Sequence, residues 1–318
     1  MSVIADINRD GWPVLALEEW LPTYETLHRW TQIVGKTRLR LAPFENHWWN
    51  CALYVTAHGL TTSPMPTRSG VVDVELDFLT DAIVARGSWG QVETMPLESK
   101  SVASFYEEWK ALMSRLGVDV KIVGKPNEIA DATPFADDHK HATYDADSAR
   151  SWWNALARVD QILNEFKGRF SGKCSPSHFW WGGFDLACTR FSGRGAPRHP
   201  GGIPNVPDYV MQEAYSRECI SAGWWPGTVD SPVPYPAFYA YAYPEPDGCS
   251  AAPIKPAEAH YHPQMREWIL PYYTVRESND PEGMILEFLE STYETAAVLG
   301  GWDVEALRAS PPIVAPRR

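Results

Sequence analysis

Val72-Asp73-Val74-Glu75-Leu76-Asp77-Phe78 alternates apolar and acidic residues without a break. Successive side chains of a β-strand point to opposite faces, so this spacing predicts a strand with one face in the core and one toward water. A half-exposed strand of this kind is typical of an antiparallel sheet whose apolar face is covered by helices. The stretch therefore indicates an α+β fold.

The patterns around this strand give the first half of the chain the order α-β-β-β-β-α. Leu27, Trp30 and Val34 recur at helical spacing before it, and Phe105 and Leu112 do so after it. We expect helices over residues 23–35 and 102–117 and strands over 47–56, 72–78, 82–85 and 91–97.

A polar, proline-containing stretch without periodicity divides the chain into residues 1–125, a linker at 126–147, and residues 148–318. The second half begins with an amphipathic helix over 148–167 and ends with the helix that has the clearest signals. Asp280 and Pro281 occupy the N-cap and first helical positions of that last helix, and Gly300 can end it. Strands are expected over 178–191 and 236–243.

The order of elements repeats, and some residues repeat with it. Leu27, Gln32 and Ile33 match Leu156, Gln161 and Ile162, His47 and Trp49 match His178 and Trp180, and Phe105 and Gly117 match Phe288 and Gly300. These matches predict an internal duplication of α-β(4)-α units, with antiparallel sheets related by a pseudo-twofold axis and an aromatic crevice between them.

The composition disfavours several classes of partner. The 40 acidic and 28 basic residues give a net charge of −12, so the overall field repels nucleic-acid phosphates and anionic membranes. The five cysteines form no C-x-x-C pair, charges interrupt the first ten residues, and no apolar stretch is long enough to span a bilayer. We therefore expect a cytoplasmic protein that binds neither nucleic acid nor membrane.

Several segments carry specific motifs. They are Leu-Pro-Thr-Tyr-Glu-Thr-Leu-His-Arg-Trp-Thr-Gln-Ile-Val-Gly-Lys at 21–36, Asn-His-Trp-Trp at 46–49, Gly-Lys-Cys-Ser-Pro-Ser-His-Phe-Trp-Trp-Gly-Gly-Phe-Asp-Leu at 172–186, Gly-Trp-Trp-Pro-Gly at 223–227 and Tyr-Pro-Ala-Phe-Tyr-Ala-Tyr-Ala-Tyr-Pro-Glu-Pro at 235–246. These segments resemble a bacterial protein family of unknown function, DUF5996, and the resemblance extends over nearly the whole chain. It implies a family identity but no activity, substrate or cofactor.

The densest group of chemically capable residues lies between 173 and 198. His178 and Asp185 are candidates for acid/base catalysis, and the glycine-rich run that follows offers Arg190 and Arg194 as holders of an anionic group. The alternative is a surface loop in which the arginines pair with acidic neighbours. Cys174, beside these residues, is expected to be a buried and inert thiol rather than a nucleophile.

Aromatic residues could line a binding site for a ring-containing or cationic group. Trp180, Trp181, Tyr239 and Tyr241 are the candidates, and the competing interpretation is packing in the core or at an interface. His47 and His178 alone supply too few ligands for zinc, so we expect no metal site.

These features favour a small-molecule enzyme, with an aromatic-lined crevice that binds an anionic or ring-containing substrate. The alternatives are a non-catalytic ligand-binding or sensor protein and a protein-interaction module, for which a homodimer would be expected. The cofactor is left open. Because the acid/base and cationic residues follow His178, we expect the functional side of the molecule to be the second half, with His47 mainly packing.

Overall fold

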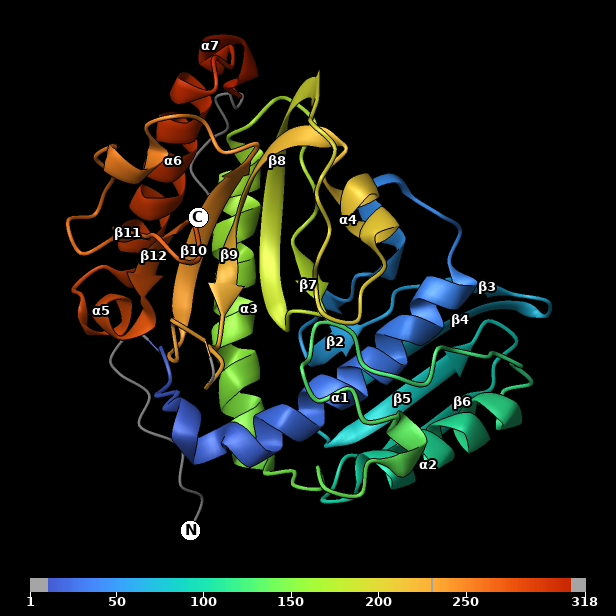
Figure 1. Ribbon diagram of the computed structural model, residues 1–318. Helices are drawn as coiled ribbons and strands as arrows, with labels where there is room; N and C mark the ends of the chain where they lie inside the picture. Colours follow the sequence, from blue (N-terminus) through green and yellow to red (C-terminus); the bar gives the residue numbers. More distant parts are fainter. Residues whose placement is uncertain (1–10, 230, 310–318) are drawn as a thin grey trace, which may run out of the picture.

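The computed structural model describes residues 11–229 and 231–309 and contains two six-stranded antiparallel sheets with helices against them (Figure 1). This confirms the α+β class. None of the described helices combines the length and the hydropathy that crossing a membrane requires.

The first sheet is built from residues 54–96 and has the order β1-β2-β4-β5-β6, with β3 paired to β4. Its apolar residues face α1 and α2, and its acidic residues lie on the outer face, as the alternation at 72–78 predicts. The elements are α1 (Leu17–Leu41), η1 (Asn46–Cys51), β1 (Tyr54–Val55), β2 (Gly59–Thr61), β3 (Met65–Thr67), β4 (Gly70–Asp77), β5 (Ala82–Gly87), β6 (Val92–Pro96) and α2 (Val102–Arg115).

The second sheet has the order β11-β12-β10-β9-β8-β7, and α3 and α6 lie behind it in Figure 1. The side chains of Asp145 and Asp280 cap α3 and α6 by accepting hydrogen bonds from backbone amides. The elements are α3 (Ala146–Gly168), β7 (His178–Trp180), β8 (Asp185–Gly195), α4 (Asp208–Ala214), β9 (Arg217–Trp225), β10 (Ala237–Tyr243), η3 (Cys249–Ala251), β11 (His260–His262), β12 (Glu267–Pro271), α5 (Tyr272–Glu277), α6 (Pro281–Leu299) and α7 (Val304–Leu307), with η2 (Phe135–Asp137) before α3.

The two sheets meet where β1 approaches β7. Leu53 and Phe179 exchange two backbone hydrogen bonds of 2.9 Å, so the edges of the sheets are joined directly. One hydrophobic core extends from α1 to α6 across both halves. The segment expected to be a linker takes part in it, because Phe135 is fully buried and Asp138 pairs with the buried Arg29 at 3.1 Å.

Several expectations need correction. Residues 46–51 form a 3₁₀ helix rather than a strand, because His47 and Trp48 have left-handed backbone angles (φ 59° for both) that a strand excludes. β2, β3, β9, β11 and β12 were not predicted at all. Each half has six strands between its first and last long helices rather than the four expected, and the second half also contains α4 and α5. The internal duplication stays a prediction. His47 and His178 nevertheless lie in different kinds of element, η1 and β7.

Candidate functional site

The candidate site lies on the face of the second sheet that points away from α3 and α6. Residues that pair across neighbouring strands share a face, as do residues two apart on one strand. Asp185, which pairs with Trp180, lies two residues from Ala187. Ala187 pairs with Gly223 and Gly223 pairs with Tyr239, so Asp185 and Tyr239 lie on one side. Tyr241 shares that side because it lies two residues from Tyr239 on β10. Glu267 shares it because it lies two residues from Ile269, which pairs with Tyr239 on β12. The alternate residues of these strands fill the core instead.

Asp185 and Tyr239 are joined across an intervening strand. The Tyr239 hydroxyl on β10 donates a hydrogen bond to the Asp185 carboxyl group on β8, and β9 lies between them. Gly223 makes this possible, because a Cβ there would lie 2.7 Å from the Tyr239 oxygen and 2.3 Å from the Leu186 carbonyl oxygen. Beside this pair, the hydroxyl groups of Tyr241 and Tyr215 are 2.6 Å apart.

A second carboxyl group comes from the segment between the halves. Glu128 has a left-handed backbone (φ 62°), and its amide donates to the Pro204 carbonyl at 2.9 Å. Its carboxyl group rests on the turn between β7 and β8, where a Cβ on Gly182 would lie 2.0 Å from Glu128 Oε1. A Cβ on Gly183 would lie 2.7 Å from Asp185 Oδ1 and 3.7 Å from Glu128 Oε2, so these two carboxyl groups are neighbours.

A polar stripe on α1 holds the segment of Glu128 and the turn between β7 and β8 in place. His28, Gln32 and Lys36 follow one another at four-residue spacing and are all buried. His28 Nε2 lies 2.8 Å from the Gly182 carbonyl oxygen, and Gln32 makes two hydrogen bonds with the backbone of Asn127 (2.8 and 2.7 Å). The sequence reasoning missed this stripe. Its signal was three polar residues at helical spacing in an otherwise buried helix.

The local electrostatics raise the pKa of each of these carboxyl groups toward neutral pH. Burial raises the pKa of Asp185 to about 6, although the hydrogen bond from Tyr239 opposes the rise. Burial, with the neighbouring Asp185 charge, raises the pKa of Glu128 to about 7 and that of Glu267 to about 8. Within the described part of the chain, none of the three has a basic nitrogen within 4 Å. Burial also lowers the pKa of Lys36 to about 8.

His178 lies on this face but belongs to a different group of contacts. Its imidazole is fully buried among aromatic rings, with its Nε2 3.3 Å from the Tyr54 hydroxyl oxygen. Burial lowers the pKa of His178 to about 3, so it stays neutral. No hydrogen bond joins it to Asp185 among the described contacts.

The two candidate tryptophans, Trp180 and Trp181, have different surroundings. Trp180 is paired with Asp185 in the β7–β8 ladder and lies on the site face. Trp181 turns into the core, where its Nε1 donates to the Cys51 carbonyl oxygen at 2.7 Å and Lys36 lies over its ring. Of the predicted aromatic lining, the structure thus places Trp180, Tyr239 and Tyr241 near Asp185.

The structure separates Arg190 and Arg194 from Asp185. The glycine-rich run continues β8 rather than forming a loop, so Arg190, five residues from Asp185, points to the opposite face. There it lies 3.4 Å from the Phe166 ring centre and pairs with both oxygens of Glu290 at 3.3 Å. Arg194 pairs with Glu218 and donates to the Gly300 carbonyl oxygen at the end of α6. Both arginines therefore already hold protein groups.

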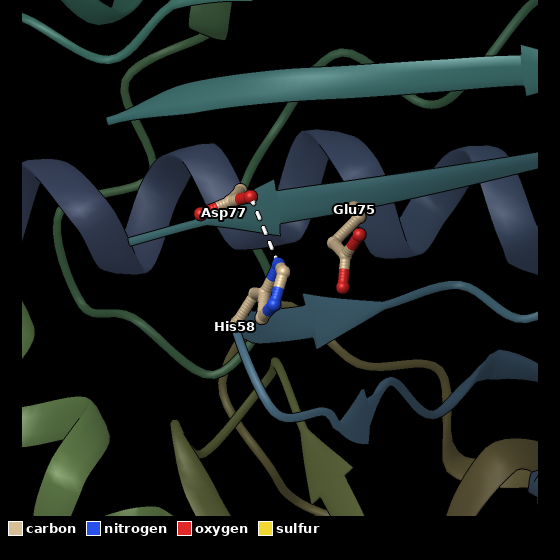
Figure 2. Close-up of side chains that lie close together, drawn as sticks. All are labelled: His58, Glu75 and Asp77. Atoms are coloured by element: carbon tan, nitrogen blue, oxygen red, sulfur yellow. Dashed lines mark hydrogen bonds and ion pairs between the residues drawn. The ribbon is translucent and has the colours of Figure 1, made fainter. Parts of the chain in front are cut away.

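A different cluster has the donor set of a metal site. His58, Glu75 and Asp77, on the outer face of the first sheet, offer ligand atoms that lie within 4.8 Å of one another (Figure 2). Asp77 already accepts hydrogen bonds of 2.9 Å from the amides of Leu79 and Thr80, and Glu75 pairs with Arg86 at 3.2 Å. These carboxylates are therefore satisfied by protein groups.

Comparison with known proteins identifies the family. Residues 12–309 match the model of a family of unknown function, DUF5996. The chain belongs to this family. The resemblance noted from the sequence motifs is thereby confirmed, and the match spans both halves, so the two sheets belong to one family unit. No curated protein and no solved structure matches the chain.

Proposed function

We propose that this DUF5996 protein is a small-molecule enzyme that uses Asp185, Glu128 and Glu267 for general acid/base catalysis. One observation carries the proposal. Three separate segments bring these carboxyl groups to one sheet face, next to tyrosine hydroxyl groups and without an ion-pair partner among the described residues. Carboxyl groups with raised pKa values and no ion-pair partner are costly when ionised, so their convergence calls for a reason other than stability.

Different surroundings suit the carboxyl groups to different roles. The hydrogen bond from Tyr239 favours the ionised form of Asp185, which then acts as the base. Glu267, whose pKa burial raises to about 8, keeps its proton at neutral pH and acts as the acid. Glu128 lies between these limits, with a pKa raised by burial to about 7, so it can act as acid or base near neutral pH.

The charge of the site bears on the substrate. Ionised carboxylates disfavour an anionic molecule, and the two arginines expected to hold one contact Glu290 and Glu218 instead. The rings of Tyr239 and Tyr241 stack 6.1 Å apart, and Trp180 lies on the same face. This lining favours a neutral or cationic molecule that contains a ring.

A ligand screen tests the proposal. Neutral and cationic ring compounds, including sugars and aromatic amines, are tested at pH 7 for a rise in melting temperature and then for turnover by NMR. We expect a compound that stabilises the wild type and is consumed by it. The Asp185→Asn variant should bind it with affinity changed less than about tenfold but lower its turnover at least about 100-fold.

Glu75→Gln, which changes a carboxylate of the other cluster, is the matched control and should behave as wild type. Tight binding without turnover by the wild type would favour a sensor protein instead. Equal turnover by wild type and Asp185→Asn would remove Asp185 from the mechanism.

A further inference from the structure

Two thiols of the second half face each other on the helix side of the sheet. Cys174 Sγ lies 3.4 Å from Cys188 Sγ, within hydrogen-bond distance for sulfur, and both cysteines are free. Cys188 is on β8, whereas Cys174 lies in a short segment that bridges to β8 opposite Arg190. From this juxtaposition we propose that Cys174 and Cys188 form a dithiol that peroxide oxidises reversibly to a disulfide.

The surroundings give the two thiols different roles. Cys174 is only partly buried, contrary to the buried thiol expected from the sequence, so a small oxidant can reach it, whereas Cys188 is fully buried. The hydrogen bond with Cys188, with the Arg190 charge adding to it, lowers the pKa of Cys174 below its ordinary value. The thiolate is the reactive form, so Cys174 is the thiol that meets peroxide and Cys188 is the one that resolves the product.

The chemistry balances with hydrogen peroxide as the only co-reactant. The Cys174 sulfur attacks one peroxide oxygen, an S–O bond forms, the O–O bond breaks, and the departing hydroxide takes the thiol proton to give water. The Cys188 sulfur then attacks the sulfenic sulfur, an S–S bond forms, the S–O bond breaks, and a second water leaves with the Cys188 proton. The two sulfurs lose two electrons in total, and the peroxide gains them.

The geometry requires little movement. A disulfide has an S–S length of about 2.05 Å, so the sulfurs must approach by roughly 1.4 Å. Cys174 lies in the segment just before β7, which contacts β8 through the Ser175 amide and the Lys173 carbonyl group. This segment can move toward β8 without disturbing the strands at the centre of the sheet.

Peptide mapping of the full chain tests the dithiol directly. Trypsin releases residues 174–190 as one peptide that contains both cysteines and no other. The native, reduced protein is treated with one equivalent of hydrogen peroxide, unfolded, alkylated and digested. We expect this peptide to be two hydrogen atoms lighter and to carry no alkyl group, while the peptides of Cys51 and Cys219 are alkylated in full. Dithiothreitol should restore two alkylation sites.

Two variants separate the roles. Cys188→Ser should accumulate a sulfenic acid on Cys174 that dimedone traps, and Cys174→Ser should leave Cys188 reduced and alkylated. The proposal is overturned if the wild-type peptide takes up two alkyl groups after peroxide. It is also overturned if Cys174 of the Cys188→Ser variant reacts no faster with peroxide than the buried Cys219.

Discussion

The two sheets each carry a group of acidic side chains on the face away from their helices, and the two groups differ in how their charge is satisfied. On the first sheet, Asp77 accepts two backbone amides and Glu75 pairs with Arg86. On the second sheet, Asp185 has a neutral tyrosine as its partner, and no ion pair involves Glu267 among the described residues.

This difference sets opposite pKa directions for the same residue type. Burial acts to raise the pKa of Asp77, but hydrogen bonds from the amides of Thr80 and Leu79 outweigh it and lower that pKa below its ordinary value. Burial dominates at Asp185 and raises its pKa to about 6. The first group is therefore a structural charge network, whereas the second holds protons that can move near neutral pH.

The largest effect is expected from Glu267→Gln. A carboxyl group whose pKa is raised in the folded state costs no stability below its ordinary pKa, and the cost grows as pH rises toward the folded value of about 8. At pH 9 the variant should exceed the wild type by about 3 kcal/mol in unfolding free energy, after allowance for partial solvent contact, and at pH 4 it should equal it. Urea unfolding across this range measures the difference. Glu75→Gln should show no such gain, and a gain of equal size there would erase the contrast between the sheets.

A smaller effect is expected from Gly182→Ala, which tests how Glu128 is held. The added methyl group would lie 2.0 Å from Glu128 Oε1, so the carboxyl group must move away from Asp185 and toward solvent. We expect a loss of about 1–2 kcal/mol in unfolding free energy and a fall of the Glu128 pKa toward its ordinary value, followed by carboxyl ¹³C NMR. Gly168→Ala, at the end of α3 with open space around it, is the control. An unchanged Glu128 pKa in Gly182→Ala would show that the turn does not position this group.

The smallest effect is expected from Asp77→Asn on the first sheet, and its sign is opposite to that of Glu267→Gln. Because the folded pKa of Asp77 is lowered, its charge stabilises the protein above its ordinary pKa, and this contribution is lost as pH falls. The variant should lose about 1 kcal/mol at pH 7 and nothing in strong acid, measured by urea unfolding at both pH values. Stabilisation at pH 7 would place Asp77 with the unsatisfied carboxyl groups.

Local signals in the sequence determined several of the individual elements. Asp280, Pro281 and Gly300 fix the ends of α6 because a capping carboxylate, a proline at the first position and a glycine at the end act within one turn. The alternation at 72–78 likewise fixed β4 and its charged face, and the same parity put Tyr239 and Tyr241 on one side of β10. Such patterns need no knowledge of distant residues.

Only the tertiary structure decided which residues the faces of these helices and strands contact. Glu128 reaches Asp185 because α1 holds a segment without regular structure against a turn 54 residues further on, and no local periodicity encodes that contact. Arg190 was expected to hold an anionic group, but the sequence does not show that Glu290 of α6 packs beside it and pairs with it. The sequence by itself determined the ends of α6 and the two faces of β4, whose signals lie within a few residues, but it did not reveal β9, β11 and β12. The site depends on strand pairing and on burial, which arise only when distant segments pack together.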